Sequence, residues 1–592
     1  MLCRSFLVSS SPTVAKTARK MNGIPRRIFW RELKRNKWQR KYATSTNVGT
    51  DEFLVKSTLP DIVIPKMSFI ERLWQDQSSF RNLVALEDAE TKKTYTYQQL
   101  QKYMATFATS LIKKFGLRPG DVVGIMMPNC PEFPVVAFGT IQAGCVVTTI
   151  NPIYKEFEIS HQASITQPKI LVTIQDCYES VVKGLKSAKV DAKVIIVDKP
   201  NQSVPSGVVK YSEIAENGEA DYAMLEKIVR KEDDIAFIPF SSGTTGLPKG
   251  VELNHRNILA AVETMQRKES RYSEIANSTF QDIVPCILPF YHIYGLIVAL
   301  TGHLCTGCKL ITVSNFSARL FMNLLKAQEV SLLYIVPPLA ILLGKHPEVT
   351  GEHFRNVRYI LCGAAPLAAT DAQAILDKSN NRLQFKQGYG ATETTSIATT
   401  TFKNVDKVDY DACGTAMAGV TLKFVDPATG NPVPVGQPGE IYIKAPVVMK
   451  RYYKNEQATK DSITEDGFFK TGDFGRYKPD AGLIITDRIK ELIKVKGLQV
   501  APAELESLLR SHPNVADVAV IGVPHDFFGE IPKALVIPRR DTKHKVTPEE
   551  LQEFVASKVA PFKRIEEVLF VKEIPKTSSG KILRRELKKL YS

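Results

Sequence analysis

One ten-residue run constrains the chain more than any other segment. The apolar stretch Ile235–Phe240 leads directly into Ser241-Ser242-Gly243-Thr244-Thr245-Gly246-Leu247-Pro248-Lys249-Gly250. Glycines allow backbone N–H groups to converge on an anion, hydroxyls add donors, and a lysine adds positive charge. A loop of Gly, Ser and Thr is often only a turn, but this one is long and follows a strand, so we expect it to bind a polyphosphate. It is not a Walker A loop, because Pro248 precedes Lys249 and Gly250 follows it.

Helix and strand patterns alternate from about residue 95 onward. Apolar residues at helical spacing cover 97–115 and 135–143. Short runs typical of buried strands occur at 122–127, 145–150, 170–173 and 194–197. This alternation predicts an α/β fold with a mostly parallel sheet. Because 592 residues exceed the roughly 250–300 that one core serves, we expect at least two domains.

The pattern changes twice in the second half of the chain. Residues 414–444 form short alternating runs with Pro-Ala-Thr-Gly and Gly-Gln-Pro-Gly turns, which predicts a small antiparallel barrel or sheet. From Leu492 onward the pattern is that of a compact α+β domain: helices at 502–511 and 548–559, and strands at 515–521, 533–538 and 567–571. We therefore expect a large N-terminal domain over residues 60–486, with parallel α/β subdomains and a small β-barrel-like subdomain, and a small α+β domain over 492–592.

Two long stretches, 133–154 and 283–308, contain no Lys, Arg, Asp or Glu. Prolines and glycines interrupt both, so we assign them to a buried core and expect no transmembrane segment. The nine cysteines are irregularly spaced. Cys305-Thr306-Gly307-Cys308 has no second pair of ligands nearby, so we expect buried cysteines rather than a zinc or redox site.

Most of the net charge of +16 lies at the N-terminus. Residues 1–50 hold twelve Lys/Arg and one acidic residue, whereas residues 51–592 hold 66 basic and 61 acidic residues. The nearly neutral body gives no electrostatic reason to expect nucleic-acid binding. A basic, acid-poor segment with Ser and Thr is typical of a mitochondrial transit peptide. We expect residues 1–42 to direct the protein to the mitochondrial matrix.

Other interpretations of this segment stay open. It could be a disordered basic tail, translation could start at Met21, and Trp30 and Trp38 would also suit peripheral contact with a membrane surface. A cytoplasmic or peroxisomal location is the alternative, although the chain does not end in the peroxisomal Ser-Lys-Leu signal.

Four further motifs follow the phosphate loop in order. They are Gln387-Gly388-Tyr389-Gly390-Ala391-Thr392-Glu393-Thr394-Thr395, Lys470-Thr471-Gly472-Asp473, Asp487-Arg488-Ile489-Lys490-Glu491-Leu492-Ile493-Lys494-Val495-Lys496-Gly497, and Pro575-Lys576-Thr577-Ser578-Ser579-Gly580-Lys581. With the phosphate loop, they resemble the motifs of the adenylate-forming superfamily, which includes acyl-CoA synthetases, 4-coumarate–CoA ligases, adenylating luciferases and peptide-synthetase adenylation domains. The resemblance covers about residues 60–590.

The resemblance implies a nucleotide site that takes ATP, Mg²⁺ and coenzyme A. Thr392 would contact the α-phosphate and Glu393 would ligate Mg²⁺, while Asp473 would bind the ribose hydroxyls and Arg488 the ribose or phosphates. The β and γ phosphates would be held by Ser241, Ser242, Gly243, Thr244, Thr245, Gly246 and Lys249. The adenine would be flanked by Gln387, Gly388 and Tyr389.

The resemblance also implies catalytic groups for two steps. Lys581 would bridge the acid's carboxylate and the α-phosphate, where negative charge is concentrated. A hinge at 487–491, centred on Lys490, would let a mobile C-terminal domain rotate for the second step.

After that rotation, Gly497 would line a pantetheine tunnel, and Lys494 and Lys496 would face the second active site or CoA. A charge run alone would indicate a solvated surface. His292 in an apolar stretch would ordinarily be a core residue, but the resemblance implies a positioning role near the carboxylate and the thiol path.

These motifs predict an ATP-dependent acid:CoA ligase that forms an acyl-AMP and then an acyl-CoA thioester. Segments 291–296, 360–366 and 388–397, expected around the acyl group, carry apolar or small side chains, so we expect an acid with an apolar tail, most simply a medium- or long-chain fatty acid. The alternatives are a 4-coumarate-type aryl acid and luciferase-like oxygenation of an acyl-adenylate. A non-catalytic nucleotide sensor or RNA-binding protein is disfavoured because the motif residues are intact. The sequence predicts no oligomeric state.

Overall fold

The computed structural model describes residues 52–199, 202–241, 247–405, 407–495, 498–525, 527–539, 545–577 and 580–592. The expected targeting segment, 1–42, lies outside these residues. They form one compact unit spanning Glu52–Ser592. Within the described part of the chain, no helix combines the length and the apolar character that a membrane crossing requires.

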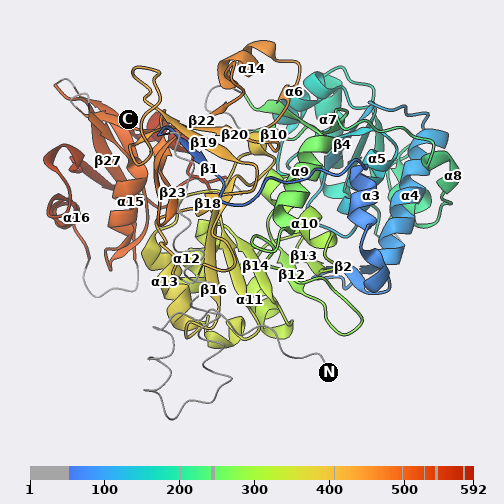
Figure 1. Ribbon diagram of the computed structural model, residues 1–592, viewed down its shortest axis with the longest axis horizontal. Helices are drawn as coiled ribbons and strands as arrows, with labels where there is room; N and C mark the ends of the chain where they lie inside the picture. The colour runs from blue at the N-terminus through green and yellow to red at the C-terminus, as the bar shows by residue number, and fades with distance from the viewer. Residues whose placement is uncertain are drawn as a thin grey trace, which may run out of the picture. The chain divides into compact units, whose positions relative to one another are not determined.

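The largest sheet is mostly parallel and carries the phosphate loop at one end (Figure 1). Its strand order is β10-β11-β9-β5-β4-β6-β7-β8, and β21 pairs with β11. The strands are β4 (Val122–Met126), β5 (Val146–Thr149), β6 (Ile170–Thr173), β7 (Lys193–Ile196), β8 (Val209–Lys210), β9 (Ile235–Phe237), β10 (Phe240–Ser241), β11 (Lys249–Asn254) and β21 (Arg451–Tyr452). Strands β4 to β9 pair in parallel, whereas β9, β11 and β10 pair antiparallel.

The helices between these strands are amphipathic or fully buried. Thr96 begins the first of them with a capping box, in which its hydroxyl accepts from the Gln99 N–H and the Gln99 side chain accepts from the Thr96 N–H. The helices are α4 (Tyr97–Lys113), α5 (Glu132–Gln142), α6 (Glu156–Thr166), α7 (Tyr178–Ser187), α8 (Tyr222–Leu225) and α9 (His255–Gln266). The uncharged stretch 133–154 is thus a buried helix followed by a buried strand, as expected.

Two smaller sheets combine parallel strands with antiparallel edges. One has the order β12-β13-β2-β3, from β2 (Val84–Asp88), β3 (Thr94–Thr96), β12 (Ile283–Cys286) and β13 (Lys309–Thr312). The other has the order β14-β15-β16-β17-β18, from β14 (Leu332–Ile335), β15 (Tyr359–Cys362), β16 (Gln384–Tyr389), β17 (Thr399–Thr400) and β18 (Thr415–Ala416). The backbone N–H of Ser331 donates to the carbonyl of Ile283 (3.0 Å), which joins the two.

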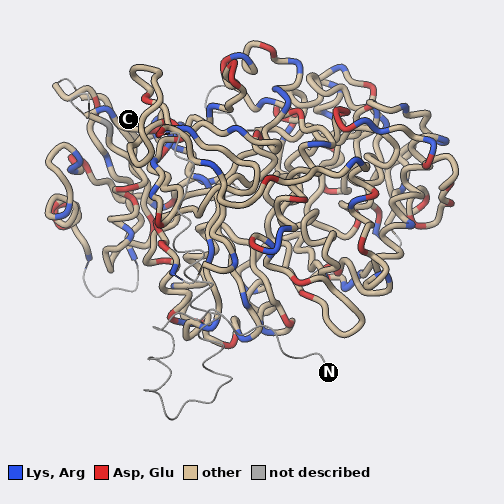
Figure 2. Tube along the Cα trace, viewed as in Figure 1, with Lys and Arg blue, Asp and Glu red and all other residues tan. Residues whose placement is uncertain are grey.

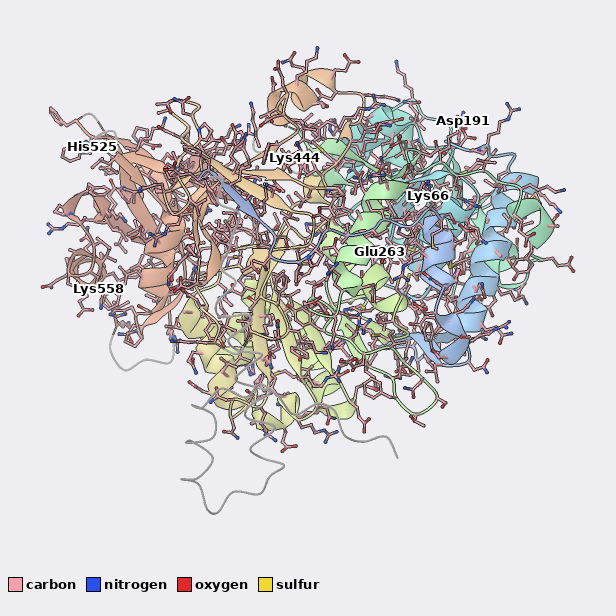
Figure 3. The ribbon with its side chains drawn as sticks, viewed as in Figure 1. Lys66, Asp191, Glu263, Lys444, His525 and Lys558 are labelled. Carbon is pink, nitrogen blue, oxygen red and sulfur yellow. The ribbon has the colours of Figure 1, made fainter. Side chains whose placement is uncertain are left out.

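A fully antiparallel sheet forms the predicted barrel-like subdomain. Its order is β1-β19-β20-β22-β23, from β1 (Leu54–Lys56), β19 (Thr421–Val425), β20 (Gly439–Lys444), β22 (Phe469–Lys478) and β23 (Gly482–Arg488). Lys444, labelled in Figure 3, marks the end of β20. Strands β22 and β23 place Asp473 directly opposite Arg488.

The C-terminal part is α+β, drawn in orange and red in Figure 1. Its sheet has the order β25-β24-β27-β26, and β28 pairs with β27 in parallel. Its elements are β24 (Ile493–Val495), β25 (Leu498–Val500), α15 (Pro502–Arg510), β26 (Val515–His525), β27 (Gly529–Pro538), α16 (Pro548–Ala556), β28 (Glu567–Phe570) and α17 (Arg584–Tyr591). The fold class agrees with the sequence prediction, and strand and helix ends differ from it by a few residues.

The remaining helices pack around the smaller sheets. They are α3 (Phe69–Trp74), α10 (Gly302–Leu304), α11 (Ala318–Ala327), α12 (Pro337–Lys345), α13 (Ala369–Lys378) and α14 (Glu456–Ser462), with the π-helix η4 (Tyr294–Thr301) and the short 3₁₀ helix η6 (Thr392–Thr394). Acidic and basic residues are interspersed over the described part of the chain (Figure 2).

Candidate active site

The phosphate loop is the tip of a hairpin. Strands β10 and β11 pair antiparallel with Ser241 opposite Lys249, so both ends of the loop are fixed, while Ser242, Gly243, Thr244, Thr245 and Gly246 lie outside the described residues. The Lys249 ammonium lies 4.9 Å from the centre of the Tyr452 ring. Ser241 Oγ is buried and has no hydrogen-bond partner among the described residues, and the Ser241 side chain lies close enough to Tyr452 to lower the pKa of that hydroxyl. A buried hydroxyl without a partner suits a site that is completed by a ligand.

Glu393 lies beside this hairpin, held by a strained turn. Gly390 is required there, because a β-carbon at this position would lie 1.5 Å from the Ser396 carbonyl oxygen. Thr395 and Ser396 have φ of 47° and 95°, in the region that side chains disfavour. The Glu393 side chain is 7% exposed, and its Oε1 accepts a hydrogen bond from the Tyr452 hydroxyl (2.9 Å).

Within the described residues, no cluster of three or more His, Cys, Asp or Glu side chains could hold a metal by itself. Mg²⁺ is usually bound through one or two carboxylates together with substrate phosphates. Glu393, next to the phosphate loop, fits that arrangement.

A second group of polar side chains lies between β16, which carries Tyr389, and the antiparallel strands β22 and β23, which carry Asp473 and Arg488. The Tyr389 hydroxyl donates to Asp473 Oδ2 (2.6 Å), and Arg488 Nε contacts Asp473 Oδ1 at 3.0 Å. The Asp473 N–H donates to the Thr471 hydroxyl (3.0 Å), which fixes the turn. Asp473 is 6% exposed. Its buried carboxylate is therefore held next to Tyr389 by the hydrogen bond from Tyr389 and the ion pair with Arg488.

The three expected adenine-flanking residues are not equivalent. Gln387 is buried, and its side-chain amide donates to the Tyr410 carbonyl (2.6 Å), so its side chain lies behind the strand. Gly388 leaves room for the neighbouring strand, since a β-carbon would lie 3.1 Å from the Thr399 carbonyl oxygen. Tyr389 alone of the three joins the polar group at Asp473. Thr392, on η6, is half-buried beside Glu393.

Lys581 lies close to the Asp473 group although it belongs to the C-terminal part. Its N–H donates to the Thr577 hydroxyl (3.1 Å), and a β-carbon on Gly580 would lie 2.6 Å from Pro338, so this loop packs against α12. Burial lowers the pKa of Lys581; the positive charge of Arg488 adds to this effect, and Glu491 and Asp473 oppose it. The structure therefore brings Lys581 to the same place as Asp473 and Arg488.

The lysines expected to serve the second step lie elsewhere. Lys494 is exposed on β24, with its backbone N–H bonded to Glu530 (2.8 Å), and Lys490 is exposed in the turn before it. Lys496 and Gly497 lie outside the described residues.

At the expected hinge, Asp487 Oδ2 accepts the Ala503 N–H (2.8 Å) at the start of α15. Burial raises the pKa of Asp487 to about 6, an effect that Arg584 opposes. Arg584 in turn contacts Glu491 and Glu506. This cluster of charges connects the hinge with the first and last helices of the C-terminal part.

His292 lies just before η4, half-buried, with its Nδ1 accepting the Tyr294 N–H (3.3 Å). Burial lowers its pKa to about 4, so the ring is neutral at pH 7. The Tyr294 hydroxyl donates to the Leu361 carbonyl (3.1 Å).

Beyond Leu361 lies a cavity of about 30 Å³. It is lined by Met265, Gln266, Ser270, Arg271, Tyr272, Ser273, Val298, Gly302, His303, Tyr334, Leu361, Ile397, Thr400 and Met417. Leu361 and Ile397 come from segments expected around the acyl group, but the lining is richer in polar and aromatic side chains than the sequence suggested.

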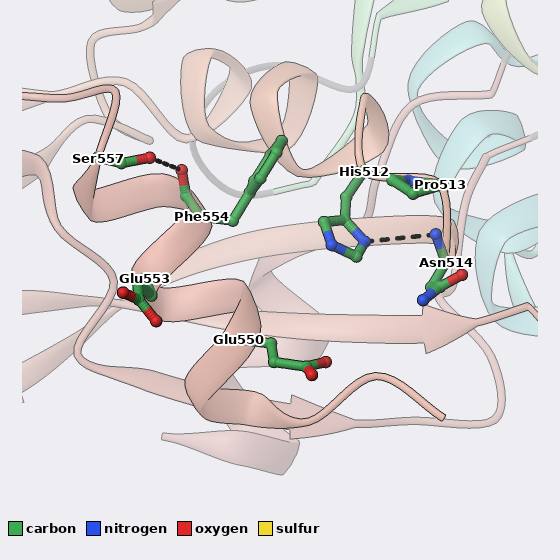
Figure 4. Close-up of a pocket in the computed structure, with 7 residues that line it drawn as sticks. All are labelled: His512, Pro513, Asn514, Glu550, Glu553, Phe554 and Ser557. Carbon is green, nitrogen blue, oxygen red and sulfur yellow. Dashed lines mark hydrogen bonds between the residues drawn. The ribbon is translucent and has the colours of Figure 1, made fainter. Parts of the chain in front are cut away.

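A larger hollow of about 480 Å³ lies on the C-terminal part, between the end of α15 and α16 (Figure 4). It is open and lined by His512, Pro513, Asn514, Glu550, Glu553, Phe554 and Ser557. None of these belongs to the motif residues, so this hollow is given no part in the chemistry.

Sequence reasoning missed two residues of the site. Tyr452, which contacts both Glu393 and Lys249, lies outside the five motifs. His303 lies in an uncharged stretch that indicates only core. No sequence signal marks Tyr452, because its hydrogen bond to Glu393 joins residues 59 positions apart.

Comparisons with known proteins identify the family of the chain. A family model described as AMP-binding enzyme matches residues 73–453, and one described as AMP-binding enzyme C-terminal domain matches residues 504–581. The chain is 36% identical over 541 residues to 4-coumarate–CoA ligase 1 of Solanum tuberosum, covering 91% of this chain and 96% of that protein.

Among solved structures, it is similar to ATP-bound MatB from Rhodopseudomonas palustris (TM-score 0.79, 28% identity, 89% of this chain and 99% of that one). It is also similar to a Mycobacterium tuberculosis fatty acyl CoA synthetase (TM-score 0.63, 26% identity, 89% of this chain and 98% of that one). The chain therefore belongs to the adenylate-forming superfamily of AMP-binding enzymes.

Proposed function

We propose that this enzyme joins an aryl carboxylic acid to coenzyme A at the expense of ATP, through an aryl-AMP intermediate. The observation that carries the ligase assignment is the convergence of Lys581, Asp473 and Arg488 from two parts of the chain on one place. Such a convergence suits a reaction that concentrates negative charge, because attack of a carboxylate on the α-phosphate brings two anions together.

Each group contributes to the first step through its position. Asp473, fixed by Tyr389 and Arg488, offers acceptor oxygens for the ribose hydroxyls. The Lys581 ammonium offsets the repulsion between the carboxylate and the phosphate. Ser241 and Lys249 hold the two ends of the phosphate loop. Mg²⁺, when bound at Glu393 with ATP, supplies additional positive charge at the phosphates.

The second step needs the CoA thiol to reach the acyl carbon. A thiol with a pKa near 8.5 is partly ionised at neutral pH, so a strong base is not required. His292, neutral because of its burial, is suited to orient the reactants by hydrogen bonding. We propose that rotation about the segment 487–491 removes Lys581 and brings Lys494, Lys496 and Gly497 to the site.

Two observations favour an aryl acid over the fatty acid expected from the sequence. The relatives at 34–36% identity over 91–92% of the chain carry the name 4-coumarate–CoA ligase. The cavity beyond Leu361 has a volume of only about 30 Å³, with Tyr272, Tyr334 and His303 in its lining, so it leaves little room for the end of a long alkyl chain.

A panel of acids tests both parts of the proposal. Pyrophosphate release and CoA-thioester formation would be measured with benzoate, cinnamate, 4-coumarate, octanoate and palmitate, with and without Mg²⁺. We expect Mg²⁺-dependent thioester formation with a kcat/KM for a cinnamate-type acid above that for either fatty acid. Thioester formation from fatty acids alone would refute the aryl assignment, and none from any acid would refute the ligase assignment. Light emission from a luciferin without thioester would favour oxygenation.

We also propose that residues 1–42 direct the enzyme to the mitochondrial matrix, on the basis of their basic, acid-poor composition. Residues 1–50 fused to a fluorescent protein should be imported by isolated mitochondria and shortened there. A fusion that stays outside at full length would contradict this.

A further inference from the structure

One buried nitrogen of the cavity beyond Leu361 makes no hydrogen bond. His303 is 5% exposed. The structure describes every residue that lines the cavity, and among their buried side-chain nitrogen and oxygen atoms only His303 Nε2 has no hydrogen-bond partner. Its polar neighbours have partners of their own: Ser270 donates to the Thr264 carbonyl (2.6 Å) and Tyr272 to the Thr401 carbonyl (2.5 Å). Because an unpaired buried donor or acceptor destabilises the fold, this nitrogen calls for a ligand.

The other ring nitrogen indicates what Nε2 offers. His303 Nδ1 lies 3.6 Å from Cys308 Sγ. Burial raises the pKa of Cys308 to about 12, so the sulfur keeps its proton and can donate it to Nδ1. Burial lowers the pKa of His303 to about 4, so the ring is neutral at pH 7. In the tautomer in which Cys308 donates to Nδ1, the single ring proton is on Nε2, which then presents an N–H donor to the cavity.

The cavity lies where the far end of an acid would lie. It is lined by Val298 and Gly302, which continue the helix that starts at Tyr294, two residues after His292. Leu361 and Ile397 line it from the segments expected around the acyl group. Its volume of about 30 Å³ is enough for one water molecule or one hydroxyl group.

We propose that His303 selects acids that carry an oxygen acceptor, such as a ring hydroxyl, at the end remote from the carboxylate. Its Nε2–H donates to that oxygen, which is the part of the bound acid that enters the cavity of about 30 Å³. This inference rests on the proposed aryl acid:CoA ligase function and makes the substrate class narrower. The His303 side chain acts on specificity, and the groups at Asp473 and Glu393 act on the reacting atoms.

A matched pair of acids isolates the hydrogen bond. 4-Hydroxycinnamate and 4-methylcinnamate have nearly the same size, but only the hydroxyl can accept the N–H. We expect wild-type kcat/KM to favour the hydroxy acid by about 10–100-fold, since a site built for a hydrogen bond rejects an analogue that lacks it.

Two substitutions at one position separate the role of the N–H from packing. His303→Leu keeps bulk without a donor and should reduce the preference to within about threefold, mainly by lowering kcat/KM for the hydroxy acid. His303→Gln restores an amide N–H and should keep a clear preference.

Each result has one meaning for the proposal. Equal wild-type rates with the two acids, or an equal loss for both in His303→Leu, would overturn the role of His303 while leaving the ligase function intact. If only fatty acids react, the proposed function fails and this inference with it. The wild-type comparison needs no variant, so it decides the question even if His303→Leu does not fold.

Discussion

The contact between Tyr452 and Glu393 leads to a sharp prediction, because one hydroxyl can be removed without altering the ring. Tyr452 donates to Glu393 Oε1 at 2.9 Å, and its ring lies 4.9 Å from the Lys249 ammonium. Burial raises the pKa of Tyr452, and the negative charge of Glu393 raises it further, so the hydroxyl stays protonated and remains a donor. Tyr452→Phe keeps the Lys249 contact and leaves one Glu393 oxygen without its donor.

The size of the effect follows from the burial of Glu393, which is 7% exposed. A hydrogen bond to a charged group contributes about 1.5–3 kcal/mol, which corresponds to a factor of about 10–150 in rate if all of it is lost at the transition state. Losing a group that orients a metal ligand typically costs about 10–100-fold in metal affinity or activity. We therefore expect adenylation to fall by about 10–100-fold and the half-saturating Mg²⁺ concentration to rise.

Acid-dependent ATP–pyrophosphate exchange across a Mg²⁺ titration measures this effect. Thioester formation from supplied acyl-AMP should stay within about threefold of wild type, since the metal serves the first step. Tyr453→Phe is the matched control, because this neighbouring ring lies under Lys454 (5.0 Å) rather than beside Glu393. An exchange rate for Tyr452→Phe within threefold of wild type at every Mg²⁺ concentration would refute the reasoning.

Three further results are expected. Gly390→Ala should abolish detectable pyrophosphate exchange, because its β-carbon would lie 1.5 Å from the Ser396 carbonyl oxygen. The control is Gly430→Ala, at a site with open space around it, which should cost only about 1 kcal/mol of stability. Similar activity in both variants would be contrary evidence. Asp487 has a folded pKa of about 6, above its ordinary value of 3.8, so wild type should lose stability relative to Asp487→Asn as the pH rises from 4 to 6. The difference in Tm between the two proteins should grow over this range and then level off. A difference in Tm that does not change with pH would count against the burial argument. His292, with a pKa of about 4, stays neutral, so the ratio of wild-type to His292→Asn thioester-forming rates should be constant from pH 6 to 8.5, and a ratio that follows an ionisation near 6.5 would contradict this.

The chemistry of the site could be predicted from sequence where its residues are neighbours in the chain. Lys470–Asp473 and Gln387–Thr395 are contiguous motifs, so residue types and spacing alone indicate a nucleotide site. The alternation of buried strands and helices fixed the α/β class for the same reason, since both signals are local.

What the sequence could not supply are contacts between distant segments. The hydrogen bond from Tyr389 to Asp473 joins residues 84 positions apart, and that from Tyr452 to Glu393 joins residues 59 apart. Gln387 belongs to the same motif as Tyr389, yet strand geometry turns its side chain towards Tyr410. His303 lies in an apolar stretch, and its ring packs 4.7 Å from that of Tyr334, which comes from strand β14 and lines the same cavity.

The position of the C-terminal part is a further property that no local pattern encodes. Lys581 and Lys494 both lie in motifs, but only Lys581 lies with Asp473 and Arg488 here, while Lys494 is exposed. On the proposed function, this is the arrangement that adenylation needs, and the second step would require rotation of the domain.

The most direct test of the account separates the two half-reactions in Lys581→Ala. One assay follows acid-dependent pyrophosphate release, and the other follows thioester formation from supplied aryl-AMP and CoA. Removing a charge that acts only in the first step should lower the first rate by at least about 100-fold and leave the second within about fivefold. An equal loss in both assays would contradict the assignment of Lys581 to adenylation and the two-arrangement account built on it.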